Sequence, residues 1–328
     1  MAERRTGSIR DWRQLSPVLA VFRMQPAEGT RVPAYKAGQY IALRRDDCRL
    51  TKKVADEQGR ARYLPDLDEM GRQRRGPVTH SYSISSAPFE TERDGHLEFY
   101  VVLEIGPTDA LGRLTETLFS LDPRVGQRVD YVDRIAGDFT LDKRAAGFES
   151  VLMVGTGTGI APFAAMVKQL DHEASQGNPP RFRLTLLHAN RTRSELAYHE
   201  ELLAIEAAGR FDFLYVPSVS RPDPKATEDG LARGRANNLL RHAFEMPLKE
   251  EEDGDPGAIE AAVRPVLPPR LPREKLRGRL APATSVLLTC GNPASMADIK
   301  RVADAVGMRF EKEDWKPVSR ADLTDARG

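Results

Sequence analysis

The first half of the chain is patterned as β-structure. Short runs rich in β-branched and aromatic residues are separated by Gly and Pro, as in antiparallel strands. These runs lie at residues 40–43, 81–85, 97–104 and 127–132. No helical period is evident before residue 110. The stretch 44–77 is dense in Arg, Asp and Gly, and it predicts an insertion that forms a surface loop or a small excursion between two strands.

The pattern changes near residue 148, where short apolar runs begin to alternate with amphipathic helical segments. The expected strand–helix pairs are 151–154 with 161–170, 183–188 with 195–208, 213–219 with 236–244, and 285–289 with 296–306. Such alternation predicts a parallel sheet with crossover helices. The stretch 249–282, rich in Pro, Glu and Arg, is interpreted as a long loop inside this half rather than as a further domain.

The two patterns together predict a two-domain protein. An antiparallel β-barrel domain is expected over residues 1–147, including the 44–77 insertion. A doubly wound α/β domain with a parallel sheet is expected over residues 148–328, ending in a C-terminal extension at 316–328. The length of 328 residues suits two domains better than one compact core.

Composition narrows the function classes. Apolar residues make up 40% of the chain and the formal net charge is +1, so no overall field favours nucleic acid or an anionic membrane. No apolar run reaches the roughly 20 residues that span a bilayer. Residues 1–13 lack the apolar region of a signal peptide, so a cytoplasmic location is expected. Cys48 and Cys290 are too few to hold a 2Fe–2S cluster, so redox chemistry needs an organic cofactor or a partner's metal.

A glycine-rich turn follows the expected strand 151–154. Residues 155–162 read G-T-G-T-G-I-A-P, and a helix is expected to begin at their end. Gly155, Gly157 and Gly159 allow backbone N–H groups to approach a pyrophosphate, and Thr156 and Thr158 add hydroxyl donors. No Gly-Lys-Ser/Thr follows, which argues against an ATP-type phosphate loop. The alternative is a structural turn without a ligand.

Basic residues follow the next strands of the same half. Arg191 comes after the second expected strand, Arg221 after the third, and Arg235 opens the helix that follows. NAD-binding folds place an acidic residue at the end of the second strand, whereas a guanidinium there suits a 2′-phosphate. The three arginines therefore favour NADP over NAD. Taken singly, an arginine at such a position is more often a solvated surface residue.

Two segments of the first half suit a flavin. Residues 79–88 form an expected strand in which Tyr82 offers a flat ring for stacking, and the neighbouring hydroxyls offer donors. Its alternative is a polar edge strand with a packed tyrosine. Gly112, Arg113 and Thr115 stand at an expected helix start, an arrangement that suits the pyrophosphate of FAD.

Four motifs occur in an order and spacing that resemble the ferredoxin–NADP reductase family. They are S-Y-S-I-S-S at residues 81–86, G-R-L-T at 112–115, the turn at 155–162, and C-G-N-P at 290–293. The resemblance covers roughly residues 15–315 and is specific only when the motifs are taken jointly. It implies an FAD-binding barrel domain followed by an NADP-binding α/β domain.

The resemblance also implies roles for individual residues. Tyr82 would stack on the isoalloxazine ring, and Ser83 would hydrogen-bond near N5, the hydride-accepting atom. Further FAD contacts would come from Tyr100, Val102, Gly112, Arg113, Leu114 and Thr115. NADP would be held by Gly155, Thr156, Gly157, Thr158, Gly159, Arg191, Arg221 and Arg235, with Cys290 and Gly291 beside the nicotinamide.

Two positions depart from the family pattern. The family carries an arginine two residues before the stacking tyrosine, where it binds the FAD phosphates, and this chain has His80. A neutral histidine donates one hydrogen bond and carries no fixed charge. Trp315 resembles the aromatic residue that covers the flavin in bacterial members, but 13 further residues follow it. Trp315 is therefore either a flavin or adenine cover or an ordinary packed residue.

The expected activity is hydride transfer between NADP(H) and FAD, with single electrons passing to or from a ferredoxin or flavodoxin. Ser83 and Cys290 are the candidate catalytic residues, expected to position and polarise the reactants rather than to act as acid or nucleophile. Two alternatives are a reductase that feeds an oxygenase through a separate ferredoxin, and a nucleotide-binding subunit without turnover. The basic cluster at 72–75 could contact an acidic ferredoxin or simply be a solvated loop.

Overall fold

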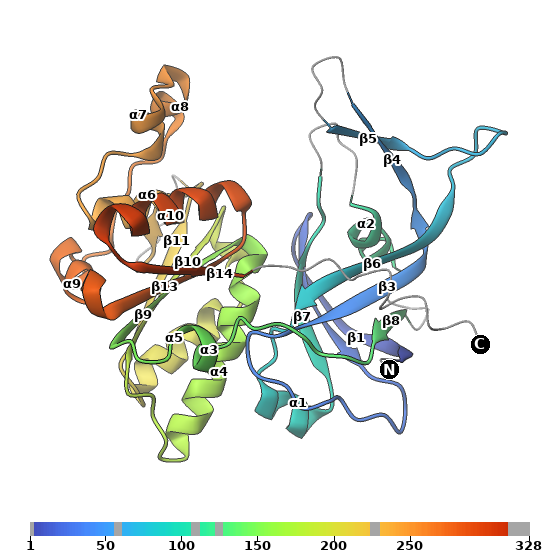
Figure 1. The fold of residues 1–328 in the computed structure, drawn as a ribbon, viewed down its shortest axis with the longest axis horizontal. Helices are drawn as coiled ribbons and strands as arrows, with labels where there is room; N and C mark the ends of the chain where they lie inside the picture. The colour runs from blue at the N-terminus through green and yellow to red at the C-terminus, as the bar shows by residue number, and fades with distance from the viewer. Residues whose placement is uncertain (1–2, 56–60, 106–111, 122–126, 224–229, 314–328) are drawn as a thin grey trace.

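The computed structural model describes residues 3–55, 61–105, 112–121, 127–223 and 230–313. Two β-sheet domains lie side by side, with the N-terminal domain on the right of Figure 1 and the C-terminal domain on the left. The fold class predicted from the sequence is confirmed. Trp315 and the extension 316–328 lie outside the described residues.

The N-terminal domain is built on a six-stranded antiparallel sheet of order β6-β3-β8-β1-β2-β7. Its strands are β1 (Arg4–Ser16), β2 (Leu19–Gln25), β3 (Tyr40–Arg49), β6 (Arg75–Ser83), β7 (Leu97–Val102) and β8 (Arg128–Val132). Phe22, Leu43 and Phe99 lie at the centre of its core and are fully buried. Helices α1 (Pro88–Asp94) and α2 (Arg113–Phe119) complete the domain.

The C-terminal domain has a six-stranded parallel sheet of order β12-β11-β10-β9-β13-β14. Its strands are β9 (Ser150–Thr156), β10 (Arg183–Asn190), β11 (Phe213–Val219), β12 (Ala232–Arg233), β13 (Ser285–Cys290) and β14 (Arg309–Lys312). The chain leaves β9 toward one edge of the sheet and returns at β13 toward the other. In such sheets the crevice at this switch point, outside the carboxyl ends of the strands, is where ligands bind.

Helices cover both faces of this parallel sheet. Helices α4 (Ala161–Ser175) and α5 (His199–Ala208) pack on one face, where Val151 and Met153 point. Helices α6 (Ala236–Ala243) and α10 (Pro293–Val306) pack on the other, where Leu152 and Val154 point. Burial on both faces explains why the strands are apolar runs without alternation. None of the helices in the described part of the chain has the length and apolarity of a bilayer span.

The stretch 44–77, expected to form a surface loop or a small excursion, is an excursion built of strands. Strand β3 continues to Arg49 and β6 already begins at Arg75, and the two remain paired along this extension. Beyond them, β4 (Thr51–Ala55) and β5 (Ala61–Pro65) form an antiparallel two-stranded ribbon. Polar and charged residues form these strands because both faces of the extension are largely exposed, so no apolar alternation marks them.

The sequence pattern also gave no indication of strands β1, β2, β12 and β14, or of several short helices. Helix α1 has seven residues, too few to establish a helical period, although the Pro at its start and the left-handed Gly95 at its end delimit it. The long loop 249–282 contains α7 (Lys249–Asp253), α8 (Pro256–Ala261) and α9 (Arg273–Gly278). Remaining short elements are α3 (Leu141–Arg144) and the 3₁₀ turns η1 (Gly157–Ile160), η2 (Arg193–Glu195) and η3 (Pro282–Thr284).

The two domains share a packed interface. Leu19, Val21 and Tyr100 of the first domain belong to the same buried cluster as the face of the parallel sheet that α4 and α5 cover. The Tyr198 hydroxyl donates to Ser85 Oγ at 2.9 Å across this interface. These contacts fix how the barrel strands face the carboxyl edge of the parallel sheet, so they set the geometry of the space between the domains.

A buried ion pair joins the helices on one face of the parallel sheet. Arg241 of α6 is fully buried and binds Asp298 of α10 through two hydrogen bonds, Nε–Oδ2 at 2.9 Å and Nη2–Oδ1 at 2.6 Å. Asn237 donates to the same carboxylate, and Arg241 also pairs with Glu252 of α7. Burial acts to raise the pKa of Asp298, but the hydrogen bonds from Arg241 and Asn237 outweigh it and hold that pKa below its usual value.

Replacing Arg241 should destabilise this domain strongly. Arg241→Met leaves the Asp298 carboxylate buried without its cation, which costs about 3–5 kcal/mol in comparable cases. Urea unfolding followed by circular dichroism should show the loss. The matched control is Arg301→Met, which removes a cation that is 61% exposed on the same helix α10 and should change stability by about 0.5 kcal/mol or less. If the two substitutions lowered stability equally, the buried Arg241–Asp298 pair would not have this stabilising role.

Candidate functional site

A cavity of about 1140 Å³ lies between the two domains, at the switch point of the parallel sheet. Strands β6 and β7 and the start of α2 line it on one side, and the loops after β9, β10 and β13 line it on the other. The structure brings most of the sequence-predicted residues together here. Those that line the cavity are His80, Tyr82, Ser83, Tyr100, Val102, Gly112, Arg113, Leu114, Thr115, Thr156, Gly157, Thr158, Gly159, Arg191, Arg235, Cys290 and Gly291.

The glycine loop and the end of β13 are packed backbone to backbone. A side chain at Gly159 would collide with the backbone of Cys290, and one at Gly291 would collide with Thr156. Gly291 also has a φ of 130°, which disfavours any other residue. The Thr156 hydroxyl accepts a hydrogen bond from the Asn292 backbone N–H at 2.9 Å. The two loops therefore form one rigid wall of the cavity.

Gly155 has a different place from the other glycines of the loop. It lies inside β9, paired with Cys290 on one side and His188 on the other, and does not line the cavity. A side chain at this position would press against Phe163 and Ile160. Its position in the strand supports close packing of η1 and α4, and the loop reaches the cavity one residue later, at Thr156.

On the barrel side, β6 carries His80, Tyr82 and Ser83 into the cavity. Burial raises the pKa of the Tyr82 hydroxyl, so this ring is neutral at physiological pH. Desolvation lowers the pKa of His80, with the carboxylate of Glu104 acting in the opposite direction and Arg113 in the same one. The imidazole of His80 is consequently neutral near pH 7.

A carboxylate that the sequence reasoning missed bridges the two domains. Glu313 follows β14 and is 4% exposed. It accepts hydrogen bonds from the Ser83 hydroxyl at 3.0 Å and from the Cys290 thiol at 2.8 Å. Burial, together with this carboxylate, raises the pKa of Cys290 well above its usual value, so the sulfur is a neutral thiol that donates. The charge-dense run at 310–314 gave no signal that one of its acids is buried.

Tyr100 links the barrel to the second domain as well as lining the cavity. Its hydroxyl donates to the backbone carbonyl of Glu195 at 2.8 Å and accepts from the Asn190 side chain at 3.1 Å. Asn190 ends β10 and also lines the cavity. Neither Asn190 nor Glu195 was expected from the sequence, since the contact depends on how the domains pack.

Of the three arginines expected to bind the 2′-phosphate, only two lie at the cavity. Arg191 and Arg235 line the cavity, whereas the side chain of Arg221 does not. The backbone N–H of Arg221 donates to the carbonyl of Arg191 at 2.7 Å, so its chain lies beside that of Arg191. Arg235 stands 3.5 Å from the carboxylate of Glu250, and Lys249 adds an unexpected basic residue to the same wall.

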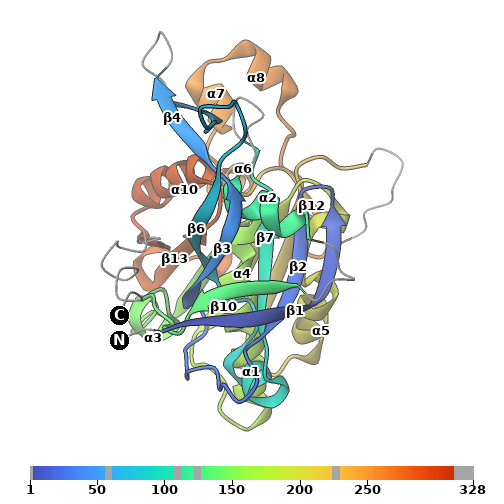
Figure 2. The same ribbon diagram turned by 90° about the vertical axis from the view of Figure 1, so that its right-hand side faces the viewer.

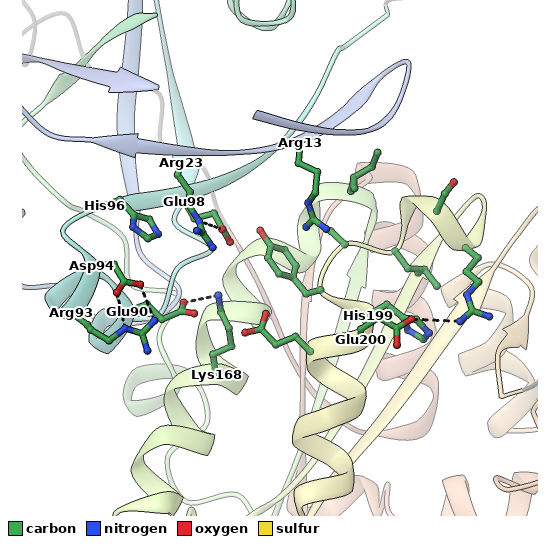
Figure 3. Close-up of a pocket in the computed structure, with 17 residues that line it drawn as sticks. Arg13, Arg23, Glu90, Arg93, Asp94, His96, Glu98, Lys168, His199 and Glu200 are labelled. Atoms are coloured by element: carbon green, nitrogen blue, oxygen red, sulfur yellow. Dashed lines mark hydrogen bonds and ion pairs between the residues drawn. The ribbon is translucent and has the colours of Figure 1, made fainter. Parts of the chain in front are cut away.

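A second cavity, of about 740 Å³, opens between the domains around α1, α4 and the start of α5 (Figure 3). Its charged residues pair with one another: Lys168 with Glu90 at 2.6 Å, and Arg23 with Glu98 at 2.9 Å. None of the sequence-predicted site residues lines it. The Lys168–Glu90 pair joins the two domains here, and the larger cavity is the candidate active site.

Comparisons with known proteins agree with this geometry. Residues 153–301 match the family described as Oxidoreductase NAD-binding domain. The chain is 31% identical to Methane monooxygenase component C of Methylosinus trichosporium over 178 residues, which are 52% of this chain and 45% of that protein. It is 29% identical to Ferredoxin--NADP reductase A of Sorangium cellulosum over 240 residues, 70% of this chain and 68% of that protein. The chain spans about half the length of several curated relatives that it matches.

A solved structure has the same arrangement of domains. A ferredoxin NADP+ reductase from Neisseria gonorrhoeae with bound FAD and NADP aligns over 95% of this chain and 99% of its own, with a TM-score of 0.59 and 20% sequence identity. That likeness concerns the fold, and the matches to curated reductases extend it to sequence. In this chain an antiparallel six-stranded domain precedes a parallel six-stranded domain, and this order agrees with the fold match and with the sequence matches. The chain belongs to the ferredoxin–NADP reductase-like family of FAD/NAD(P)-binding oxidoreductases.

Proposed function

We propose that this enzyme transfers hydride between NADP(H) and FAD, and exchanges single electrons with a ferredoxin or flavodoxin. The observation that carries the proposal is the single cavity that joins the tyrosine strand β6 to the glycine loop at the sheet's switch point. A flavin in this cavity would supply both hydride and one-electron chemistry. The residues of the chain supply binding, alignment and exclusion of water.

The barrel side has the shape and donors that FAD needs. Tyr82 offers a ring face, and Tyr100 and Val102 provide an adjoining wall of β7. At the start of α2, a side chain at Gly112 would lie 2.7 Å from Thr115 Oγ1 and 2.9 Å from Glu104 Cβ, so only glycine fits there. Gly112, Arg113, Leu114 and Thr115 would hold the pyrophosphate.

The opposite wall suits NADP. Gly157, Thr158 and Gly159 form the turn at the start of α4, where backbone N–H groups favour a pyrophosphate. Arg191 and Arg235 line the same cavity and would bind the 2′-phosphate. Arg221 would act through the backbone of its neighbour Arg191 rather than through its own guanidinium. The choice of NADP over NAD depends on these arginines.

Ser83, Glu313 and Cys290 would align the reacting rings. Their hydrogen bonds join the two domains beside the cavity, so they hold the barrel strand in position relative to the end of β13. The neutral thiol of Cys290 and the hydroxyl of Ser83 are donors, not nucleophiles. Holding two rings in a fixed stacked geometry converts an encounter between molecules into a step within one complex, and this alignment is the main source of rate.

A reductase that supplies electrons to an oxygenase is the second candidate. The match to Methane monooxygenase component C supports it. With Cys48 and Cys290 as its only cysteines, this chain has no cysteine-ligated iron–sulfur cluster of its own. A separate ferredoxin would therefore carry electrons from this reductase to the oxygenase.

The proposed activity has a direct test. Protein loaded with FAD should lose its visible flavin absorbance when NADPH is added under anaerobic conditions, and should then reduce ferricyanide. Ser83→Ala removes one donor of the bridge and should slow flavin reduction by about tenfold, the cost of one lost charge-assisted hydrogen bond. Protein that cannot be loaded with FAD, or that retains its flavin absorbance with NADPH, would exclude the proposal.

The arginines should determine the choice of nucleotide. Arg191→Ala and Arg235→Ala each remove a guanidinium partner of the 2′-phosphate and should raise the Kd for NADPH by about tenfold or more. The Kd for NADH should change little, because NADH lacks that phosphate. Fluorescence titration of each variant with both nucleotides measures this. Arg221→Ala is the matched control, since its side chain does not line the cavity; a loss as large as that of Arg191→Ala would contradict the arrangement.

His80 should make FAD binding depend on pH. Because the pKa of His80 is lowered, its imidazole is neutral near pH 7. It gains its charge only when the pH falls below the usual pKa of a histidine. Protonation adds a cation beside the FAD phosphates, so the Kd for FAD should decrease as the pH falls from 7 to about 5.5. His80→Arg supplies the charge permanently and should bind FAD about tenfold more tightly at pH 7, without this pH dependence. If the Kd for FAD varied with pH in the same way in the wild type and in His80→Arg, His80 would lie away from the phosphates.

A further inference from the structure

Strands β4 and β5, with the turn at 66–74, form a projection that we call the hairpin arm. It leaves the six-stranded sheet where β3 ends and β6 begins, and it projects away from the barrel in both views (Figures 1 and 2). Its base is hydrogen-bonded: Leu50 N–H donates to Arg74 O, Asp66 N–H donates to Leu50 O, and Gln73 Nε2 donates to Leu50 O at 2.7 Å. The arm is thus a built element of the barrel domain.

The hairpin arm exposes large apolar side chains. Tyr63 is 46% exposed, Leu64 48%, Leu67 45% and Met70 76%. Among the described residues only two other large apolar side chains, Ile105 and Val266, are comparably exposed. Single exposed apolar residues are ordinary, but their concentration on one projecting element marks an interaction surface.

Cations surround these apolar residues. Residues 51–75 contain seven Lys and Arg residues and five carboxylates, a net charge of +2. Two of the carboxylates are held inside the arm, Asp66 by Lys52 at 3.1 Å and Asp68 by Arg72 at 2.9 Å. Lys53 and Arg74 are exposed and form no ion pair with any residue that the structure describes. The arm therefore carries a small net positive charge, with Lys53 and Arg74 as its exposed cations.

Negatively charged residues project from the other domain. Helices α7 and α8 project on the same side of the molecule as the hairpin arm (Figure 1). Their segment carries six carboxylates: Glu250, Glu251, Glu252 and Asp253 are paired with basic residues, whereas Asp255 and Glu260 form no ion pair with any residue that the structure describes. An acidic protein that approaches this side is attracted to the arm and repelled by α7 and α8. Such a combination of attraction and repulsion selects one orientation of the partner.

We propose that the hairpin arm is the docking surface for an acidic electron-carrier protein, an inference that rests on the function proposed above. Strand β6 connects the arm to the cavity: Arg75 stands at the base of the arm, and Tyr82, seven residues later, lines the cavity. At ~3.3 Å per residue the two are about 23 Å apart along the strand. A carrier seated against the arm therefore lies beside the barrel wall of the cavity.

The composition of the hairpin arm fits this class of partner. Electron-transfer encounters are small, and complementary charge governs their rate of association. Aromatic residues, Met and Arg are enriched at the centres of protein interfaces, and Tyr63, Met70 and Arg74 are of these types. An anionic membrane would need a continuous apolar face, whereas the apolar residues of β5 alternate between the two faces of the ribbon.

The test compares reduction of a small and a large acceptor by the intact FAD-loaded enzyme. The charge reversal Lys53→Glu with Arg74→Glu should leave NADPH-dependent ferricyanide reduction unchanged. It should raise the KM for an acidic 2Fe–2S ferredoxin, or for an acidic flavodoxin, by about tenfold or more. Met70→Ser with Leu64→Ser should raise the same KM at high salt, where charge is screened.

The matched control is Arg181→Glu with Lys275→Glu, an equal change of charge away from the arm. Arg181 precedes β10, at the edge of the sheet opposite the cavity, and Lys275 lies in α9. This control should not change the KM for either carrier.

Two outcomes overturn the docking proposal while leaving the proposed function intact: equal KM values for the arm variant and the control, or loss of binding to phosphatidylglycerol vesicles in the arm variant with an unchanged KM. Failure of the wild type to reduce either carrier, although it reduces ferricyanide, overturns both the docking proposal and the carrier part of the proposed function. Failure to reduce ferricyanide overturns the proposed function itself.

Discussion

The order of the parallel strands determines where chemistry can occur in this protein. β9 lies between β10 and β13, and the chain leaves β9 in one direction and returns at β13 in the other. Their carboxyl ends therefore stand side by side without a crossover helix between them. The turn after β9 and the turn after β13 approach so closely that only glycine fits at 159 and at 291. This backbone contact positions the cavity residues of these two turns.

The second domain alone gives half of the site, and buried polar contacts bring the other half to it. Tyr100 reaches Glu195 and Asn190, Tyr198 reaches Ser85, and Lys168 reaches Glu90. The Glu313 carboxylate forms such a contact with Ser83 and Cys290, two residues that line the cavity. A buried carboxylate with two donors has little freedom to move without losing hydrogen bonds that water cannot replace there. Its position couples the separation of the domains to the spacing of the groups that would align the rings.

The sequence was informative where a local pattern has a structural cause. The glycine loop, the C-G-N-P turn and the apolar strands of the second half could be placed because sterics and burial dictate them locally. Glu313 could not, because its two partners include Ser83, 230 positions away. The arginines were expected together from strand ends alone, yet only Arg191 and Arg235 face the cavity, since the direction of a loop side chain is set by tertiary packing. Strands β4 and β5 escaped detection because they bury neither face.

The distribution of charge over the surface indicates how a partner could dock, whereas the net charge of the chain does not. A net charge of +1 gives no overall field, yet the hairpin arm is basic and the α7–α8 segment is acidic. Both project from one side of the molecule, each from a different domain. Since screening limits such fields to about 10 Å at ordinary salt, each acts only on a partner that is already near. Separated charges of opposite sign therefore contribute little to solubility and much to the orientation of a docked protein, which an enzyme needs when the distance between two redox centres limits its rate.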